Sequence, residues 1–235
     1  MSEWWTYSLA DFLMYTPQTF ERLLVAYNDR VYPAQLPAFG LGIWLAWAAL
    51  RGTARQLRIG LGLLGVCWLW IAYAFFWRQL ATIDLAAPYF AHGFAIQGAL
   101  LLGAAFALRD DAAAAPLPQR VAATLLVDVA VVVMPAALPP LTATLAGGAT
   151  NWGTASVFGL APDATAIATL GFLAASGRLR WLLAIPLLWC IVSGALLWTM
   201  RFPHALAIPV LAALAMIVAL RDPDASDRAS PPQVG

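Results

Sequence analysis

Lysine is absent from this 235-residue chain, and all thirteen of its basic residues are arginine. The absence excludes a retinal protein, because the retinal Schiff base requires a lysine amine. It also excludes ATP binding through a P-loop, whose lysine holds the phosphates. The two cysteines have no CxxC spacing, and we expect no nucleic-acid partner. The sequence requires no cofactor.

Charged residues are also scarce, at 11% of the chain, whereas 62% of the residues are hydrophobic and the mean hydropathy is +0.77. Soluble domains carry roughly 25% charged residues. Apolar runs of about 20 residues recur along the chain, and each is long enough to cross a hydrocarbon core as a helix. A helix pairs its own backbone polar groups, as the bilayer interior demands. The composition therefore predicts an all-α, polytopic transmembrane helical bundle with the lipid bilayer as its main partner.

About seven spans are predicted from the apolar runs. The fifth is the weakest, because it carries Asp163 and two threonines. It could instead be a broken or re-entrant element, which leaves six spans as the alternative. The predicted spans are 31–50, 59–77, 90–108, 121–138, 160–176, 179–200 and 202–220.

The arginines alternate between the connections of these spans. Connections on one side carry nine of them, and those on the other side carry four. Short cytoplasmic connections hold the excess of positive charge in membrane proteins. We therefore predict that the N-terminus lies outside and the C-terminus in the cytoplasm. The nine are Arg51, Arg55, Arg58, Arg109, Arg120, Arg178, Arg180, Arg221 and Arg228; the four are Arg22, Arg30, Arg78 and Arg201.

Residues 1–30 form an N-terminal amphipathic or interfacial segment. Thr16 can cap a helix that opens on Pro17, where the missing amide donor costs nothing. This helix could lie on the outer membrane surface, or it could pack over the bundle as a lid. Residues 31–220 form the transmembrane bundle, and residues 221–235 form a flexible cytoplasmic tail. Apolar residues recur at helical spacing at Phe20, Leu23, Leu24, Tyr27 and Val31, and Trp4, Trp5 and Tyr7 would anchor the segment.

Asp128 is the one acid well inside a strongly apolar run, LLVDVAVVVM. A charge at that depth costs on the order of 2–3 kcal/mol, so the side chain should face the bundle interior or a watery cavity. Gln97 is a candidate partner for it. The two residues are therefore candidates for transport and proton coupling, and the alternative is an acid that only orients the helices.

The segment 147–169, GGATNWGTASVFGLAPDATAIAT, combines polar side chains with glycines and a proline. An interrupted helix there could expose backbone groups to a polar ligand. Asn151, Asp163 and Thr165 are the candidate ligand residues. The alternative is an ordinary external loop that leads into a helix capped by Asp163.

His92 and His204 both fall toward the outer ends of their predicted spans. If they face one another, two neutral imidazoles could ligate a haem iron or, together with an acid, a metal ion. The alternative is that each imidazole only forms hydrogen bonds at the membrane interface. Haem is the one cofactor for which the sequence offers a candidate pair of ligands.

Two further patterns favour packing over chemistry. Gly60, Gly62 and Gly65 match the dinucleotide fingerprint but lie inside an apolar span, where small residues allow close helix packing. Cys67 and Cys190 fall near the middle of the second and sixth spans, and we interpret them as small buried hydrophobes.

Four segments carry a resemblance to a known family: YTPQTFERLLVAYNDRVYPAQ at 15–35, WLWIAYAFFWRQLATIDLAAPYF at 68–90, FGLAPDATAIATLGFLA at 158–174 and IPLLWCIVSG at 185–194. They resemble a family of bacterial multi-pass membrane proteins of unknown function. The resemblance implies a bacterial cytoplasmic membrane location and no particular activity. A cysteine often precedes the proline of the third segment in that family, whereas this chain has Ala161 there.

Two classes of function remain open. The first is a small-solute or proton-coupled transporter or channel, indicated by Asp128 and the polar segment around Asp163, and it is the one we favour. The second is a non-catalytic membrane subunit or anchor with membrane protein partners, which the scarcity of polar side chains would explain. A haem-binding electron carrier built on the two histidines is weaker. An enzyme has the least support, because no nucleophile–base or metal motif is visible.

Overall fold

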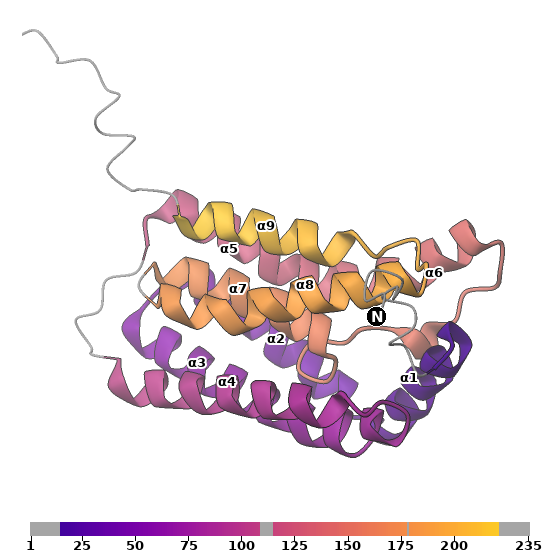
Figure 1. The fold of residues 1–235 in the computed structure, drawn as a ribbon. Coiled ribbons are helices and arrows are strands. Elements are labelled where there is room, and N and C mark those ends of the chain that lie inside the picture. Colours follow the sequence, from indigo (N-terminus) through magenta and orange to yellow (C-terminus); the bar gives the residue numbers. More distant parts are fainter. Residues whose placement is uncertain (1–14, 109–114, 178, 221–235) are drawn as a thin grey trace, which may run out of the picture.

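The computed structural model describes residues 15–108, 115–177 and 179–220, and every regular element in these ranges is helical (Figure 1). The all-α prediction is confirmed. The α-helices are α1 (Pro17–Val31), α2 (Gln35–Arg51), α3 (Ala54–Trp70), α4 (Ala87–Ala107), α5 (Leu117–Asp128), α6 (Met134–Ala146), α7 (Pro162–Ser176), α8 (Ala184–Thr199) and α9 (Ala207–Leu220). The π-helix η3 (Ile71–Trp77) continues α3, and the π-helix η5 (Val129–Val133) joins α5 to α6. Three short 3₁₀ helices complete the described elements: η4 (Leu80–Thr82), η6 (Trp152–Thr154) and η7 (Arg180–Leu183).

Several of these helices are long and apolar enough to cross a membrane. Within the described ranges there are four, and a fifth is added if α1 and α2, bent by 90°, are one broken span. The apolar helix α9 is shorter, with 14 residues. Seven spans are therefore not confirmed. The four are Ala54–Thr82, Ala87–Ala107, Leu117–Leu145 and Arg180–Thr199.

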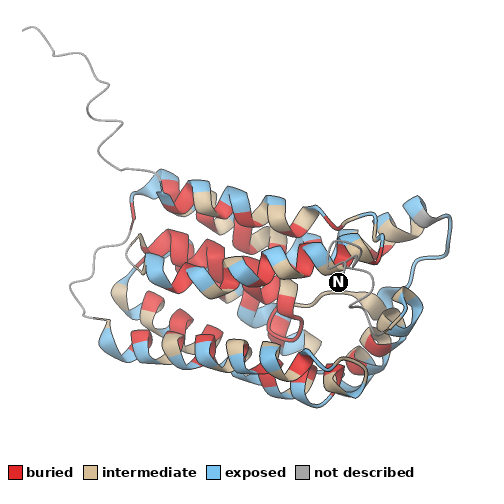
Figure 2. Ribbon diagram, in the orientation of Figure 1, coloured by how far each residue is buried: buried red, intermediate tan, exposed pale blue. Residues whose placement is uncertain are grey.

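Helix α7 occupies the centre of the bundle. Of its 15 residues, all but Asp163 are buried (Figure 2). Its sequence is rich in alanine and threonine, so the neighbouring helices α2, α3, α5, α8 and α9 can all pack against it. At 1.5 Å per residue α7 is only about 22 Å long, so it is shorter than the apolar thickness of a bilayer. The weak fifth span of the sequence is thus the central helix of the structure.

Helices α3 and α4 pack closely through glycine. A Cβ at Gly65 would lie 2.9 Å from the carbonyl oxygen of Gly98, and a Cβ at Gly98 would lie 2.9 Å from that of Gly65. Gly60 faces the ring of Phe172 on α7, whereas nothing lies within 4 Å of a Cβ at Gly62. The small-residue packing predicted for this run is confirmed at Gly60 and Gly65 and is wrong for Gly62.

Helix α1 crosses one end of the bundle, as Figure 1 shows. Thr16 caps it as predicted, because its hydroxyl oxygen accepts the backbone N–H of Thr19 at 3.2 Å, and Pro17 is its first residue. Leu23 and Tyr27 are buried against the bundle. The structure thus contains the lid arrangement that the sequence left open. The predicted anchors Trp4, Trp5 and Tyr7 lie outside the described residues.

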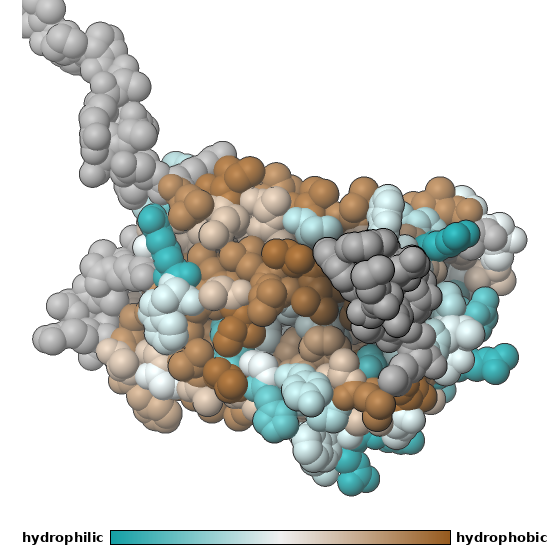
Figure 3. Space-filling model, viewed as in Figure 1, coloured by the Kyte–Doolittle hydropathy of each residue, from teal (hydrophilic) through white to brown (hydrophobic). Residues whose placement is uncertain are grey.

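Large apolar side chains cover the outside of the helices. Phe106 is 88% exposed, Ile191 62% and Val66 58%, although all three lie within the candidate spans. Figure 3 shows hydrophobic side chains over the middle of the bundle and hydrophilic ones gathered toward the α1 end. Exposed apolar surface of this extent requires an apolar partner, and it is compatible with a membrane protein.

The described arginines separate to the two ends of the bundle. At the end away from α1, Arg120 donates to the carbonyl oxygens of Leu50 and Arg51, both at 2.7 Å, and Arg58 donates to that of Leu108 at 2.7 Å. These cations cap the last turns of α2 and α4, where the helix dipole favours positive charge. Residues 221–235, together with Arg109 and Arg178, lie outside the described residues.

Candidate functional site

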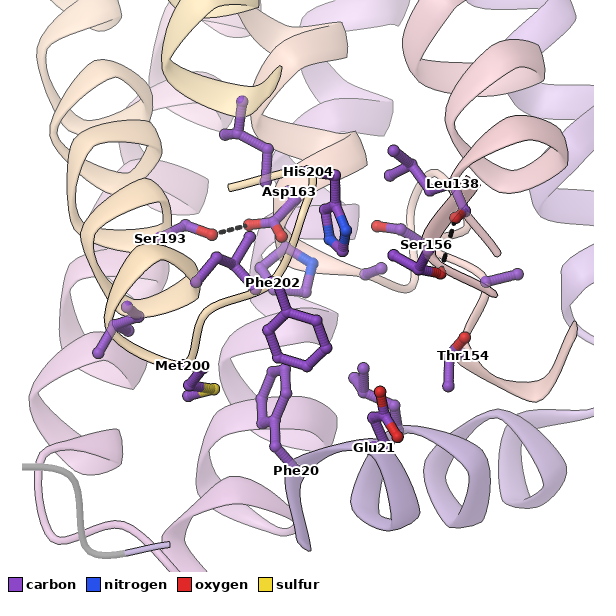
Figure 4. A pocket seen from close by; sticks show the side chains of 18 of the residues that line it. Phe20, Glu21, Leu138, Thr154, Ser156, Asp163, Ser193, Met200, Phe202 and His204 are labelled. Carbon is purple, nitrogen blue, oxygen red and sulfur yellow. Dashed lines mark hydrogen bonds between the residues drawn. The ribbon is translucent and has the colours of Figure 1, made fainter. Parts of the chain in front are cut away.

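A cavity of about 110 Å³ lies at the α1 end of the bundle. Figure 4 shows that residues from α1, the segment before α7, the start of α7, the end of α8 and the loop before α9 surround it. Its walls are mainly apolar and aromatic. Among the polar residues that line it are Asp163, Glu21 and His204.

Asp163 provides the main polar group of the cavity. It is the second residue of α7, and its Oδ1 accepts the indole N–H of Trp189 at 2.9 Å and the hydroxyl of Ser193 at 2.7 Å. Both donors come from one face of α8, because residues four apart lie on the same side of a helix. No described residue donates to Oδ2. This second oxygen is free to bind a proton or a ligand.

Aromatic packing fixes the orientation of Trp189. Its ring contacts Phe76, Phe90 and Phe94 edge-to-face, at centroid distances of 5.1, 5.5 and 5.1 Å. Edge-to-face pairs stabilise a defined ring geometry. The indole N–H is thereby aimed at Asp163, so the carboxyl group is held in place by groups that are themselves rigid.

Helix α1 supplies the opposite wall. Figure 4 shows Phe20 and Glu21 extending from α1 toward the cavity. The ring of Phe20 meets that of Phe202 at 6.5 Å, and Phe202 packs on the imidazole of His204 at 5.5 Å. An aromatic wall therefore runs from α1 to the loop before α9.

His204 lines the same cavity in a partly buried position. Its Nδ1 is buried and has no hydrogen-bond partner among the described residues. Burial lowers the pKa of this imidazole, because removal from water disfavours the charged form. His204 is therefore neutral at neutral pH and adds no positive charge to the cavity.

The segment before α7 is held from two sides. The backbone N–H of Gly159, which has a φ of +77°, donates to the Thr165 hydroxyl at 2.8 Å, and that hydroxyl donates to the carbonyl oxygen of Ala161 at 2.8 Å. From α1, the phenol of Tyr27 donates to the carbonyl oxygen of Leu160 at 3.0 Å. These contacts fix the start of α7, and with it Asp163, relative to α1.

Asn28 extends the contact between α1 and this segment. Its amide nitrogen donates to the carbonyl oxygens of Gly153 at 2.7 Å and Ala155 at 3.1 Å, while Gln35 donates to the carbonyl oxygen of Asn28 at 2.8 Å. Tyr27 and Asn28 therefore bind the stretch that leads into α7. Their role in the structure is to close one end of the cavity.

The predicted ligand residues separate in space. Only Asp163 reaches the cavity. Thr165 is fully buried, and its hydroxyl accepts the backbone N–H of Gly159 in the segment before α7. Asn151 is exposed and accepts the backbone N–H of Gly153 at 3.1 Å, in a groove beside α1. The backbone of this segment is a loop with the 3₁₀ turn η6 that leads into α7, as in the alternative, but Asp163 does not cap the helix. A ligand role for these residues stays a prediction.

Asp128 and Gln97 are not partners. Gln97 is fully buried and donates to the carbonyl oxygen of Leu182 at 3.0 Å, whereas Asp128 is partly exposed and has no hydrogen bond or ion pair within the described ranges. The expected pairing is wrong because α4 packs on α3 and α8, while α5 packs on α2, α7 and α9. Asp128 does not line the cavity, and its role in transport stays a prediction.

The two histidines do not share a site. His92 is exposed on α4, where its Nδ1 lies 2.6 Å from the carbonyl oxygen of Pro88 and its ring packs on Trp77. Among the described residues no group of three or more histidine, cysteine, aspartate and glutamate side chains could hold a metal. Cys67 is partly buried, Cys190 is buried, and both are free thiols.

Sequence reasoning missed most of the residues that surround Asp163. Trp189 and Ser193 lie in an apolar span, and their spacing of four was the available signal. Glu21, next to the apolar Phe20 on the N-terminal helix, is partly buried and reaches the cavity. Nothing in the local sequence indicated that this helix would face α8.

Comparison with known proteins gives a family and no activity. A family model described as "Family of unknown function (DUF6064)" matches residues 17–228. No curated protein and no solved structure matches the chain.

Proposed function

Because the chain belongs to this family of unknown function, we propose from its own geometry that it is a proton-coupled transporter of a small solute. The observation that carries the proposal is the carboxyl group of Asp163, held by Trp189 and Ser193 at the cavity with one oxygen free. An acid inside a membrane bundle is costly and is commonly part of a proton or substrate pathway.

Among the described residues, the charge of Asp163 has no fixed counterion. None of the described residues that line the cavity is an arginine, and the chain has no lysine. A carboxylate in apolar surroundings needs either a proton or a bound cation to balance its charge. Exchange between these two states at Asp163 would couple solute binding to proton movement.

The shape of the bundle favours a transporter over an open channel. The cavity lies at one end, and beyond Asp163 the remaining residues of α7 are buried in the centre. Helices that start part-way through a bundle, next to irregular backbone, form the substrate sites of many secondary transporters. Helix α7 and the segment before it have this arrangement.

The location is part of the same proposal. We place the protein in the bacterial cytoplasmic membrane, with the α1 end outside and the C-terminus in the cytoplasm. The excess of arginine in the connections at the other end supports this orientation. The cavity would then open toward the outside.

Proton flux in proteoliposomes tests the proposal. Internal pH is followed with a trapped dye after addition of tetramethylammonium, tert-butanol or methanesulfonate, which are similar in size and shape but differ in charge. The parent should show solute-dependent proton flux above empty vesicles, and Asp163→Asn should lose it. Asp128→Asn tests the residue that the sequence favoured. Equal flux in the parent and Asp163→Asn, or parent flux equal to that of empty vesicles for all three solutes, would overturn the proposal.

A further inference from the structure

We propose that the cavity binds a small organic cation between Asp163 and Glu21. This inference rests on the proposed function only in using the same cavity, and it assigns the chemical class of the solute. Three properties of the cavity carry it: the sign of its charge, the nature of its walls and its size.

The charge of the cavity is negative or zero. Asp163 on α7 and Glu21 on α1 face it from opposite walls. Among the described residues, the other titratable groups around Asp163 are the imidazole of His204 in the loop before α9, the thiol of Cys190 on α8, and the phenols of Tyr15 and Tyr27. None of them is positively charged at neutral pH. Of the described side chains, an anion would therefore meet two carboxylates and no cation, whereas a cation would be attracted by both.

The walls also favour a cation. The rings of Phe20, Phe75, Phe202 and Trp189 line the cavity. Aromatic faces attract cations through the negative potential of the ring, and quaternary ammonium groups are recognised in this way. The donors on α8 point at Asp163 and are used by it. The site therefore offers a cation two carboxyl groups and an apolar, aromatic surround.

The size of the cavity limits the ligand. Its volume of about 110 Å³ is somewhat smaller than the roughly 150 Å³ of an engineered cavity that admits benzene. A compact ammonium ion fits this limit.

Binding of the cation would be linked to proton release. If Asp163 holds a proton in the empty cavity, the incoming cation replaces it, the proton leaves to water, and the charge of the site is unchanged. The cation would also connect α1 to α7, because its two carboxyl partners lie on these two helices. Helix α1 is therefore a positioning element for the ligand as well as a lid.

Isothermal titration calorimetry of the purified full chain in detergent tests the inference. Tetramethylammonium should give a saturable binding isotherm, and tert-butanol and methanesulfonate should give none. Asp163→Asn should weaken binding of tetramethylammonium by about tenfold or more, since it removes a charge partner from a largely desolvated site. Glu21→Gln should weaken it to a smaller degree. The matched control is Asp29→Asn, an exposed acid on α1 that does not line the cavity, and it should bind as the parent does.

The outcomes separate the two proposals. Binding of tert-butanol or methanesulfonate in place of tetramethylammonium, or tetramethylammonium binding unchanged in both Asp163→Asn and Glu21→Gln, would overturn the cation assignment. Proton flux driven by tert-butanol or methanesulfonate would support the transporter proposal and contradict the assignment of a cation as its solute. Saturable, Asp163-dependent binding of tetramethylammonium without proton flux would support the cation site and contradict the transporter proposal. Glu21→Gln, on the outer helix, serves as the second variant if Asp163→Asn does not fold.

Discussion

Tyr27 on α1 donates its phenolic hydrogen to the carbonyl oxygen of Leu160, 3.0 Å away, although the two residues are 133 positions apart in the chain. The bond joins the first described helix to the segment that leads into α7. Asp163 follows Leu160 by three residues, and Glu21 lies on the same helix as Tyr27. The relative position of the two acids at the cavity therefore depends on this contact.

Removal of the Tyr27 hydroxyl should destabilise the fold. In Tyr27→Phe the Leu160 carbonyl loses a buried partner, and we expect a loss of about 1–2 kcal/mol in the free energy of unfolding. Denaturant unfolding in detergent measures it. Tyr89→Phe is the matched control, because Tyr89 is 79% exposed, and it should be neutral. A neutral Tyr27→Phe would show that the bond does not hold α1 in place.

The contact between α3 and α4 should resist enlargement of Gly98, whereas enlargement of Gly93 on the same helix should be tolerated. Gly98→Ala would place a methyl group 2.9 Å from the Gly65 carbonyl oxygen, and such overpacking costs about 1–3 kcal/mol. Gly93→Ala, on the same helix, has nothing within 4 Å of the new Cβ. It should be neutral or stabilising by up to about 1 kcal/mol through helix propensity. Thermal unfolding of the two variants makes the comparison, and equal melting temperatures would contradict it.

Arg120 should contribute to stability through the end of α2. Arg120→Ala removes two hydrogen bonds to the last carbonyl oxygens of that helix, and we expect a loss of about 1 kcal/mol. Arg55→Ala removes an exposed arginine at the same end of the bundle whose side chain has no hydrogen bond to another described residue, and it should be neutral. If the unfolding free energy falls equally in both variants, the loss comes from removing a positive charge at this end of the bundle and not from removing the hydrogen bonds of Arg120 to the end of α2.

The stability of the protein should fall at mildly acidic pH because of His204. Burial lowers the pKa of His204 in the folded state from its ordinary value of 6.5, so the unfolded chain binds the proton more tightly. The stabilisation is complete above about pH 6.5 and is lost as the pH falls toward the folded pKa, by at most about 1.4 kcal/mol per pH unit.

Melting temperatures of the parent and His204→Asn between pH 7.5 and about pH 5 measure this dependence, which should be weaker in the variant. His92→Asn removes the exposed histidine outside the cavity and should keep the slope of the parent. A parental slope in His204→Asn would show that other groups cause the acid sensitivity.

Much of the local structure was predictable from particular residues. The capped start of α1 at Thr16 and Pro17 follows from the hydrogen-bonding capacity of the hydroxyl and the fixed φ of proline. The helical character of the apolar runs follows from backbone hydrogen bonding in an apolar surround. The last run was predicted to begin at residue 202, but α9 begins at Ala207. Phe202 and His204 lie instead in the loop that closes the cavity.

The choice between Asp128 and Asp163 was not predictable from the chain. Asp128 has the more apolar sequence neighbours, and depth along a helix favoured it. Which of the two acids lines the cavity depends on the direction in which each points from its helix, and this direction relative to the bundle depends on which helices pack together. Asp128 is on a partly exposed face of α5, whereas Asp163 meets Trp189 and Ser193 from a helix that follows it in the chain.

The sequence by itself determined the helical class, the apolar exterior and the separation of arginines to two ends, because these properties depend on composition and on residues close together in the chain. The tertiary structure alone decided that α7 is the central helix, that α1 is a lid, and that Asp163 and Glu21 share a cavity. These properties arise from contacts between different helices, and some of them join residues more than a hundred positions apart. Helix packing and directed hydrogen bonds select those contacts, and neither can be predicted from the hydropathy of neighbouring residues.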